Sequence, residues 1–289
     1  MGRIVILAGG VSSRMRKSDQ SSENVDQMLI EDANKKSKSM IRLGDNDRPF
    51  LDYLLFNVYK AGYKEIVILT NDKDNSIREY YSTKLENFSN LGIQFTFAIQ
   101  PIPEGRVKPF GTADALYYAL KSKPEWNGKK FTMCNSDNLY SVSALMLMLD
   151  SNYSNSMIDY NRNGLKYESD RTDKFSITQK DNEGFITNII EKPSKDEIAI
   201  ILNKDGYIGV SMNIFQFSYN MIFPFLETVP LHPVRLEKEL PTAIKLLIDN
   251  YPKSLFAFPL EEHVPDLTDK ADIVKVKQYL EKEFKDISF

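Results

Sequence analysis

The feature that most constrains the fold is an apolar run near the amino terminus that stops at two glycines. Residues 4–8 are Ile, Val, Ile, Leu and Ala, and Gly9, Gly10 and a short polar stretch ending at Arg14 follow them. An apolar run bounded by glycine is typical of a buried strand in a parallel sheet. Glycines let the backbone approach a ligand closely, and successive N–H groups can point at phosphate oxygens. The pattern therefore predicts a strand that ends in a phosphate-binding loop, with the Arg14 guanidinium placed to bind phosphate.

Strand-like and helix-like segments alternate through the first half of the chain. The expected strands are 2–8, 65–70, 93–100 and 130–135, and the expected helices are 50–61, 75–86, 111–121 and 142–149. Alternation at this spacing predicts βαβ units in a mostly parallel sheet. Ligands of such sheets bind beyond the carboxyl ends of the strands. We therefore expect Gly9–Arg14, Gln100 and residues 135–138 to converge.

The second half is richer in expected strands and turns. The expected elements are a hairpin of 174–180 and 185–191, strands 207–217 and 254–260, and helices 221–226, 235–250 and 272–284. Because no linker separates the halves, we expect one domain over 1–289, with halves of about 1–150 and 151–289. The fold class is predicted to be α/β: a Rossmann-like, mostly parallel mixed sheet flanked by helices, with a smaller β-rich lobe and a C-terminal helix.

Composition excludes several classes of protein. A net charge of −3 gives no basic surface for nucleic acid. The single cysteine, Cys134, excludes an internal disulfide framework and a cysteine-based zinc site. No apolar run reaches the ~18 residues of a membrane span, and no signal-peptide pattern precedes the first strand, so we expect a cytoplasmic protein without a membrane partner. A dinucleotide-dependent oxidoreductase is disfavoured because no G-x-G-x-x-G follows the first strand.

Two aspartates are candidates for metal ligands. Asp137 follows an expected buried strand, where its carboxylate can bind a divalent cation. Mg²⁺ is usually bound by one or two carboxylates together with water and substrate phosphates; the alternative for Asp137 is an ordinary turn aspartate. Asp266 is a candidate second ligand, although Asp269 and Asp272 nearby are equally well explained as acids at a helix start.

Two basic or charged segments also have alternative readings. Lys35, Lys36 and Lys38 form either a solvated basic run or a segment from which one lysine reaches a triphosphate as a point charge. Glu191 and Lys192, followed by proline, close the expected hairpin; they are either an ordinary charged strand end or part of a binding site.

In this order, the segments resemble the sugar-1-phosphate nucleotidylyltransferase family, also called nucleoside-diphosphate-sugar pyrophosphorylases. The matching segments, in chain order, are 7–15 (the family's L-A-G-G-x-G-T-R motif), 37–40 (its P-K), 100–101 and 111–113 (its base-binding segments), 135–138 (its G-D-x metal motif), 191–193 (its E-K-P) and 266–268 (its later aspartate segment). The resemblance covers most of the chain.

The resemblance implies Mg²⁺-dependent transfer of a nucleotidyl group from a nucleoside triphosphate to a sugar-1-phosphate, with pyrophosphate released. It assigns the smaller lobe to the sugar and leaves a homo-oligomer open. The implied roles are catalysis by Arg14 and Lys38, which offset the charge of the leaving pyrophosphate; nucleotide binding by Leu7, Ala8, Gly9, Gly10, Ser12, Ser13, Gln100, Gly111 and Thr112; sugar-phosphate binding by Glu191, Lys192 and Asn213; and Mg²⁺ binding by Asp137 and Asp266.

Several departures from the family pattern leave the substrates open. Ser12 replaces a loop glycine, and the loop also resembles molybdopterin guanylyltransferases and cytidylyltransferases. Residues 106–110 are inserted before Gly111, and Phe175-Ser176 replaces a Tyr-Gly pair of the sugar pocket. Two alternatives therefore remain: a nucleotidyltransferase of the same fold acting on a non-sugar phosphorylated acceptor, and a catalytically silent regulator that binds sugar nucleotides.

Overall fold

The computed structural model of the protein describes residues 1–11, 15 and 27–285, apart from the side chains of 203–205. The strands are β1 (Gly2–Leu7), β2 (Tyr63–Asn71), β3 (Gln94–Gln100), β4 (Lys130–Asn135), β5 (Asn155–Asn161), β6 (Ile177–Lys180), β7 (Ile186–Ile190), β8 (Gly209–Val210), β9 (Ile214–Ser218) and β10 (Leu255–Leu260). The helices are α2 (Gln27–Lys35), α3 (Phe50–Lys60), α4 (Ser76–Ser82), α5 (Leu85–Asn90), α6 (Thr112–Lys121), α7 (Val142–Leu149), α8 (Ser169–Thr172), α9 (Lys195–Asp205), α10 (Tyr219–Thr228), α11 (Leu240–Asn250) and α12 (Asp272–Glu283). Within these residues, none of the helices has the length and apolar character of a membrane span.

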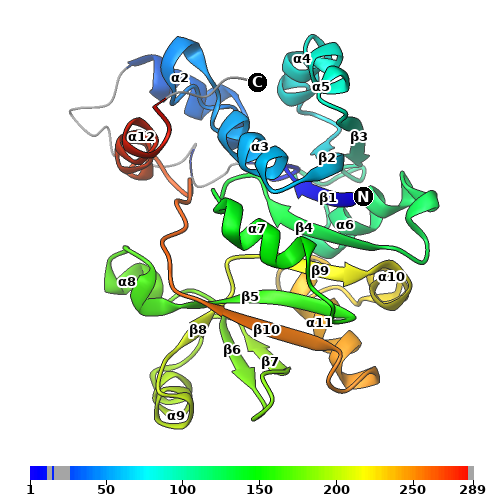
Figure 1. Cartoon of the computed structure of the whole chain (residues 1–289), viewed down its shortest axis with the longest axis vertical. Helices are drawn as coiled ribbons and strands as arrows, with labels where there is room; N and C mark the ends of the chain where they lie inside the picture. The colour runs from blue at the N-terminus through cyan, green and yellow to red at the C-terminus, as the bar shows by residue number, and fades with distance from the viewer. Residues whose placement is uncertain (12–14, 16–26, 286–289) are drawn as a thin grey trace.

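The described strands form one mixed sheet that runs through both halves of the chain (Figure 1). The strand order is β3-β2-β1-β4-β9-β5-β8-β6-β7, and β10 pairs with β5. Strands β3, β2, β1 and β4 are parallel, whereas β9 lies antiparallel to both β4 and β5. The predicted α/β class with a mostly parallel mixed sheet is therefore confirmed, and the parallel strands β1 to β4 come from the first 135 residues.

Both faces of β1, β2 and β4 are buried, because successive side chains of a strand point to opposite faces and helices cover each face. In β1, Ile4 and Ile6 contribute to the apolar cluster that contains α3, α7 and α12, and Val5 and Leu7 contribute to the cluster that contains α6, α10 and α11. A strand covered on both faces needs a continuous apolar run, which explains the composition of residues 4–8.

The last helix returns to the first half of the molecule. Figure 1 shows α12 beside α2 and α3, far from the strands that precede it in the sequence. The ring of Phe284, just after α12, lies 5.2 Å from the ring of Tyr53 in α3. The two halves are therefore interleaved. The segment that carries Asp266 passes beside the end of β4 before α12 begins.

Several local predictions are confirmed by the structure. Strand β4 has the predicted bounds, and Cys134 within it is buried as expected. The side chain of Ser141 caps α7, since its hydroxyl accepts a hydrogen bond from the backbone N–H of Ala144 at 3.0 Å. The predicted hairpin is present as the antiparallel pair β6 and β7.

Three expected elements are divided or shortened in the structure. The strand expected over 207–217 is split into β8 and β9, because Asn213 between them has a φ of 57°, which a strand cannot contain. The helix expected over 75–86 is two helices, α4 and α5. The helix expected over 235–250 begins only at Leu240, with Pro241 in its first turn, where a missing N–H costs little.

Candidate active site

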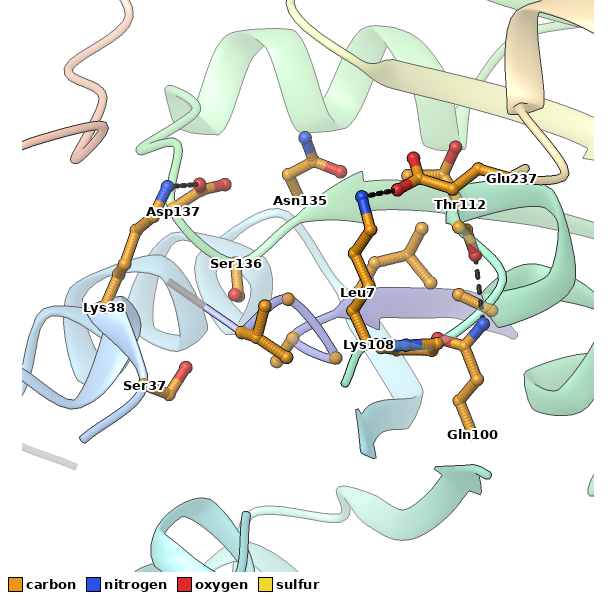
Figure 2. A pocket seen from close by; sticks show the side chains of 17 residues that line it. Leu7, Ser37, Lys38, Gln100, Lys108, Thr112, Asn135, Ser136, Asp137 and Glu237 are labelled. Atoms are coloured by element: carbon orange, nitrogen blue, oxygen red, sulfur yellow. Dashed lines mark hydrogen bonds and ion pairs between the residues drawn. The ribbon is translucent and has the colours of Figure 1, made fainter. Parts of the chain in front are cut away.

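A pocket of about 400 Å³ lies beyond the carboxyl ends of β1, β3 and β4 (Figure 2). Its lining residues include Leu7, Ala8, Gly9 and Gly10 after β1, Gln100 at the end of β3, Asn135, Ser136 and Asp137 after β4, and Lys38, Lys108, Gly111, Thr112 and Glu237 from surrounding segments. The expected convergence of the three strand ends is confirmed for these residues. Ser12, Ser13 and Arg14 lie outside the described residues.

The glycine loop is hydrogen-bonded to the neighbouring strand β2. The Ala8 N–H donates to the Leu69 carbonyl at 2.8 Å, and the Asn71 side chain donates to the Gly9 carbonyl at 3.0 Å. A Cβ at Gly9 would lie 3.3 Å from Gln100 Oε1, tighter than ordinary contact, whereas a Cβ at Gly10 would meet no atom within 4 Å. A side chain at Gly9 would therefore require Gln100 to shift by a few tenths of an ångström, whereas the space beside Gly10 is open to a ligand.

Lys38 and Asp137 form an ion pair at one end of the pocket (Figure 2). Lys38 begins a single 3₁₀ turn, Lys38–Met40, and its Nζ lies 2.8 Å from Asp137 Oδ2. Both side chains are largely buried, with 14% and 27% exposed. Lys35 and Lys36 instead pair with Glu31 and Asp32 of α2. Of the three lysines in the basic run, only Lys38 therefore contributes to the described pocket lining.

Asp266 lies next to Asp137 because two distant segments pair as a short antiparallel bridge. The Leu267 N–H donates to the Asp137 carbonyl at 2.9 Å, and the Leu139 N–H donates to the Pro265 carbonyl at 2.8 Å. Burial, together with the neighbouring Asp137 carboxylate, raises the pKa of Asp266 to about 6. Two acids in this arrangement disfavour each other's ionisation, and a bound cation would relieve that repulsion.

The donor set at this end fits magnesium. Among the described residues, no group of three or more His, Cys, Asp or Glu side chains gathers at one point. Mg²⁺ does not require such a group, since it is usually held by one or two carboxylates, with water and substrate phosphates completing its octahedral shell. The oxygen-only pair of Asp137 and Asp266, beside a pocket with open space at Gly10, matches that preference.

The other end of the pocket is built around Gln100 and Gly111. Gln100 is only 1% exposed, and its Nε2 donates to the Gly111 carbonyl at 3.0 Å and to Asp114 Oδ2 at 2.7 Å. Gly111 has a φ of +106°, and a Cβ there would lie 2.8 Å from the Lys238 carbonyl. The amide nitrogen of Gln100 already donates to Gly111 and Asp114. Gln100 could therefore contribute to a base site through its side-chain oxygen, and through the hydrogen bond that fixes Gly111.

Lys108, Pro109 and Glu237 line the pocket but were not among the candidate residues from sequence. Lys108 Nζ forms an ion pair with Glu237, and Arg106 Nη2 donates to the Leu236 carbonyl at 3.0 Å. These contacts join the inserted segment 106–110 to the segment before α11 as one wall of the pocket (Figure 2). The insertion was visible in the sequence, but its partner segment was not, because the two are separated by more than 120 residues.

The expected sugar-phosphate residues occupy the next part of the same sheet edge, outside the described lining of the pocket. Glu191 follows β7, and its Oε1 accepts a hydrogen bond from Ser176 Oγ at 2.6 Å. Asn213 precedes β9, and its N–H donates to Ser211 Oγ at 3.3 Å. The Ser211 N–H in turn donates to the Ser176 carbonyl at 2.9 Å, which links Glu191 to Asn213. Lys192 adopts a left-handed backbone, with a φ of 50°.

Asn213 connects this region to the pocket. Cys134 in β4 pairs with Ile214 in β9, which places Asn213 beside Asn135 of the pocket lining. The Tyr140 hydroxyl donates to the Met212 carbonyl at 2.7 Å and receives the Asn135 N–H at 3.4 Å, so the two strand ends are held together. The structure thus places Asn213 next to Asn135 of the pocket lining and leaves Glu191 and Lys192 farther along the edge.

Comparison with known proteins identifies the relatives of this chain. The sequence model of the family described as nucleotidyl transferase matches residues 33–257, more than half of the 289 residues. Glucose-1-phosphate adenylyltransferase 2 of Vibrio cholerae is 23% identical over 219 residues, which are 75% of this chain and 49% of that protein. Glucose-1-phosphate adenylyltransferase of Corynebacterium aurimucosum is 25% identical over 195 residues, or 65% of this chain and 42% of that protein.

The fold also has a solved counterpart of matching size. UDP-glucose pyrophosphorylase from Acinetobacter baumanii superposes with a TM-score of 0.68 at 19% identity, covering 98% of this chain and 95% of that one. By contrast, the chain spans about half the length of the curated relatives described above. The structural likeness supports the architecture of sheet and helices.

Proposed function

Because this chain belongs to the nucleotidyl transferase family, we propose that it transfers a nucleotidyl group from a nucleoside triphosphate to a sugar-1-phosphate. The products are a nucleoside-diphosphate sugar and pyrophosphate. The observation that carries the proposal is the pocket at the strand ends, where the glycine backbone, Lys38 and Asp137 meet. The names of the relatives, glucose-1-phosphate adenylyltransferase and UDP-glucose pyrophosphorylase, support a sugar-1-phosphate as the acceptor.

The reaction brings two anions together. A phosphate oxygen of the sugar-1-phosphate attacks the α-phosphorus of the triphosphate, and the bond from that phosphorus to the oxygen bridging to the β-phosphate breaks. Pyrophosphate leaves with the bonding electrons, and no covalent bond to the protein is formed. Positive charge beside the phosphates therefore lowers the barrier. Lys38 adds an ammonium group to the pocket that the glycine loop also lines, and Arg14 is expected to add a second cation.

We infer a magnesium site at Asp137 and Asp266. When bound there, Mg²⁺ would neutralise the charge of the substrate phosphates. Asp137 and Asp266 would hold the ion, and Lys38, paired with Asp137, would keep that carboxylate oriented at the edge of the pocket. Glu191, Lys192 and Asn213 would bind the sugar phosphate from the adjoining sheet edge, and Gln100, Gly111 and Thr112 would contact the nucleotide at the opposite end.

Pyrophosphate release tests the proposal. The purified chain is incubated with Mg²⁺ and each of five nucleoside triphosphates, combined in turn with several sugar-1-phosphates and with phosphorylated alcohols. We expect release only in combinations that contain a sugar-1-phosphate, and its loss in Asp137→Asn. Pyrophosphate release with phosphorylated alcohols but not with sugar-1-phosphates would show that the acceptor is not a sugar-1-phosphate. Ligand-induced melting shifts without release in any combination would contradict catalysis and favour a binding protein.

A further inference from the structure

Arg171 makes a charged contact with Asp266, a proposed metal ligand, that the proposed function does not use. It lies in α8, in the segment that precedes the expected sugar pocket. Its Nη2 donates to Asp266 Oδ2 at 2.6 Å, and its Nη1 donates to Asp272 Oδ1. The guanidinium carbon lies 4.3 Å from the centre of the Tyr167 ring. With 25% of its side chain exposed, Arg171 is held on three sides by partners.

The contacts of Asp266 are distributed unequally between its two oxygens. Both side-chain hydrogen bonds that described residues make to this carboxylate end on Oδ2: one from Arg171, and one from the Thr268 hydroxyl at 2.6 Å. Among the described residues, Oδ1 is therefore the oxygen that is left for another ligand.

Asp272 binds both Arg171 and the loop that carries Asp266. Its Oδ2 accepts the N–H groups of Thr268 and Asp269 at 2.8 and 3.0 Å, while its Oδ1 accepts from Arg171. One guanidinium thus joins α8, the loop that carries Asp266 and the first turn of α12. A planar fork can hold two carboxylates in fixed positions at once, which the single ammonium of lysine does not reproduce.

We propose that Arg171 is a positioning residue for the magnesium site: it fixes Oδ2 of Asp266, so that Oδ1 is the oxygen presented to the cation. The inference rests on the assignment of Asp137 and Asp266 under the proposed function. It adds to that assignment a residue from the segment 162–173, which belongs to none of the sequence motifs.

Two effects of Arg171 on cation binding oppose each other. Its positive charge repels a second cation, whereas its hold on Asp266 orders a ligand before the cation arrives. The charge of Arg171 is already balanced by two carboxylates, Asp266 and Asp272, at hydrogen-bond distance. The ordering effect is therefore the larger one, and loss of an outer-shell partner commonly weakens metal binding by ~10–100-fold.

Binding of Mn²⁺ to the purified protein, followed by the paramagnetic resonance signal of free Mn²⁺, tests the inference without any turnover. The variants are Arg171→Lys, which keeps the charge but not the fork, Arg171→Gln, which removes both, and Asp137→Asn, which removes a proposed ligand. Arg162→Gln is the matched control, because Arg162 pairs with Asp173 in the same segment at 2.9 Å rather than with Asp266. Thermal melting in the presence of a chelator checks that each variant is folded.

We expect both Arg171 variants to bind Mn²⁺ about 10-fold more weakly than the wild type, and Arg162→Gln to bind as the wild type does. Tighter binding by Arg171→Gln with unchanged binding by Arg171→Lys would overturn the inference, since Arg171 would then be only a repelling charge. Unchanged binding in both would also overturn it. If Asp137→Asn binds like the wild type, or the wild type does not bind, the magnesium site itself is wrong and the inference fails with it.

Discussion

Among single residues, Lys38 has the position that matters most for the proposed chemistry. Its ammonium group is paired with Asp137 inside the pocket, whereas Lys35, three residues earlier, is exposed and paired with Glu31. A charge beside the leaving pyrophosphate stabilises the transition state more than the ground state.

We therefore expect Lys38→Met to lower kcat/KM for pyrophosphate formation by roughly 100- to 1,000-fold. Lys35→Met, which removes the same charge from the same run, should stay within about 2-fold of the wild type. Initial rates of pyrophosphate release measure both variants, and far-UV circular dichroism checks folding. Equal rates for the two variants would remove Lys38 from the catalytic machinery.

His263 links single-residue chemistry to stability. Burial, with Lys166 and Arg171 nearby, lowers the pKa of His263 to about 4. Its Nδ1 accepts the Lys166 N–H at 3.2 Å, a bond that requires the neutral ring. The unfolded chain takes up this proton near pH 6.5 and the folded chain only near pH 4, so stability is present above that range and falls as pH decreases through it.

The variant His263→Asn keeps an acceptor near Nδ1 but cannot take up the proton. We expect the loss in free energy of unfolding between pH 6.5 and 4 to be smaller in the variant than in the wild type, by on the order of 1–2 kcal/mol after allowance for partial solvent exposure. Urea unfolding at a series of pH values measures the difference. Parallel pH profiles for the two proteins would show that His263 is not responsible.

At the level of elements, the start of α6 depends on one backbone conformation. Gly111, at the N-cap of α6, has a φ of 106°, and the segment before α11 packs directly against it. The carbonyl of Lys238 accepts the Ala113 N–H at 3.0 Å, and the Thr112 hydroxyl accepts the Leu240 N–H at 3.0 Å. The segment before α11, which carries Glu237 at the pocket, is therefore held in place by hydrogen bonds to the start of α6.

Two glycine variants separate backbone strain from collision. Gly111→Ala introduces both a disfavoured φ and a Cβ 2.8 Å from the Lys238 carbonyl, whereas Gly92→Ala has a φ of +70° with no atom within 4 Å of the new carbon. We expect Gly92→Ala to lower the free energy of unfolding by about 1 kcal/mol and Gly111→Ala by about 2–4 kcal/mol. Only Gly111→Ala should also raise KM for the triphosphate. Equal costs in urea unfolding would argue against the collision.

For the molecule as a whole, β9 is the strand that joins the two halves of the sheet. Phe215 pairs with Met133 of β4 on one side and with Met157 of β5 on the other, and it is buried. The single tryptophan, Trp126, is buried in the first half, where its Nε1 donates to Glu65 at 2.7 Å. A continuous sheet and a returning α12 predict that both halves unfold together.

Phe215→Ala tests this cooperativity. We expect a loss of about 3–5 kcal/mol, the usual cost of removing a buried phenyl ring. Trp126 fluorescence and far-UV circular dichroism should show the same shifted midpoint, since one transition involves the whole chain. Ile200→Ala, at a position 63% exposed on α9, is the control and should change stability by less than about 0.5 kcal/mol. Separate midpoints for the two signals would indicate two independently folding units.

Much of the parallel half could be predicted from sequence because its signals are local. The apolar run of 4–8, its glycines and the capping Ser141 each depend on neighbours within a few residues. Predictions failed where a single backbone conformation interrupted a favourable pattern, as Asn213 does between β8 and β9. Strand β5 and helix α9 were not predicted. Strand β5 pairs with β9, β8 and β10, and no local sequence pattern identifies these partners.

The sequence by itself determined the strand–loop–strand order that places glycines, Gln100 and Asp137 at one edge of a parallel sheet, since the direction of parallel strands decides which ends meet. Only the tertiary structure decided which charges become partners there. Lys38 rather than Lys35 reaches Asp137, Lys108 meets Glu237, and Arg171 meets Asp266. Such pairs join segments far apart in the chain, and charge interactions depend on distance in space rather than on separation in sequence.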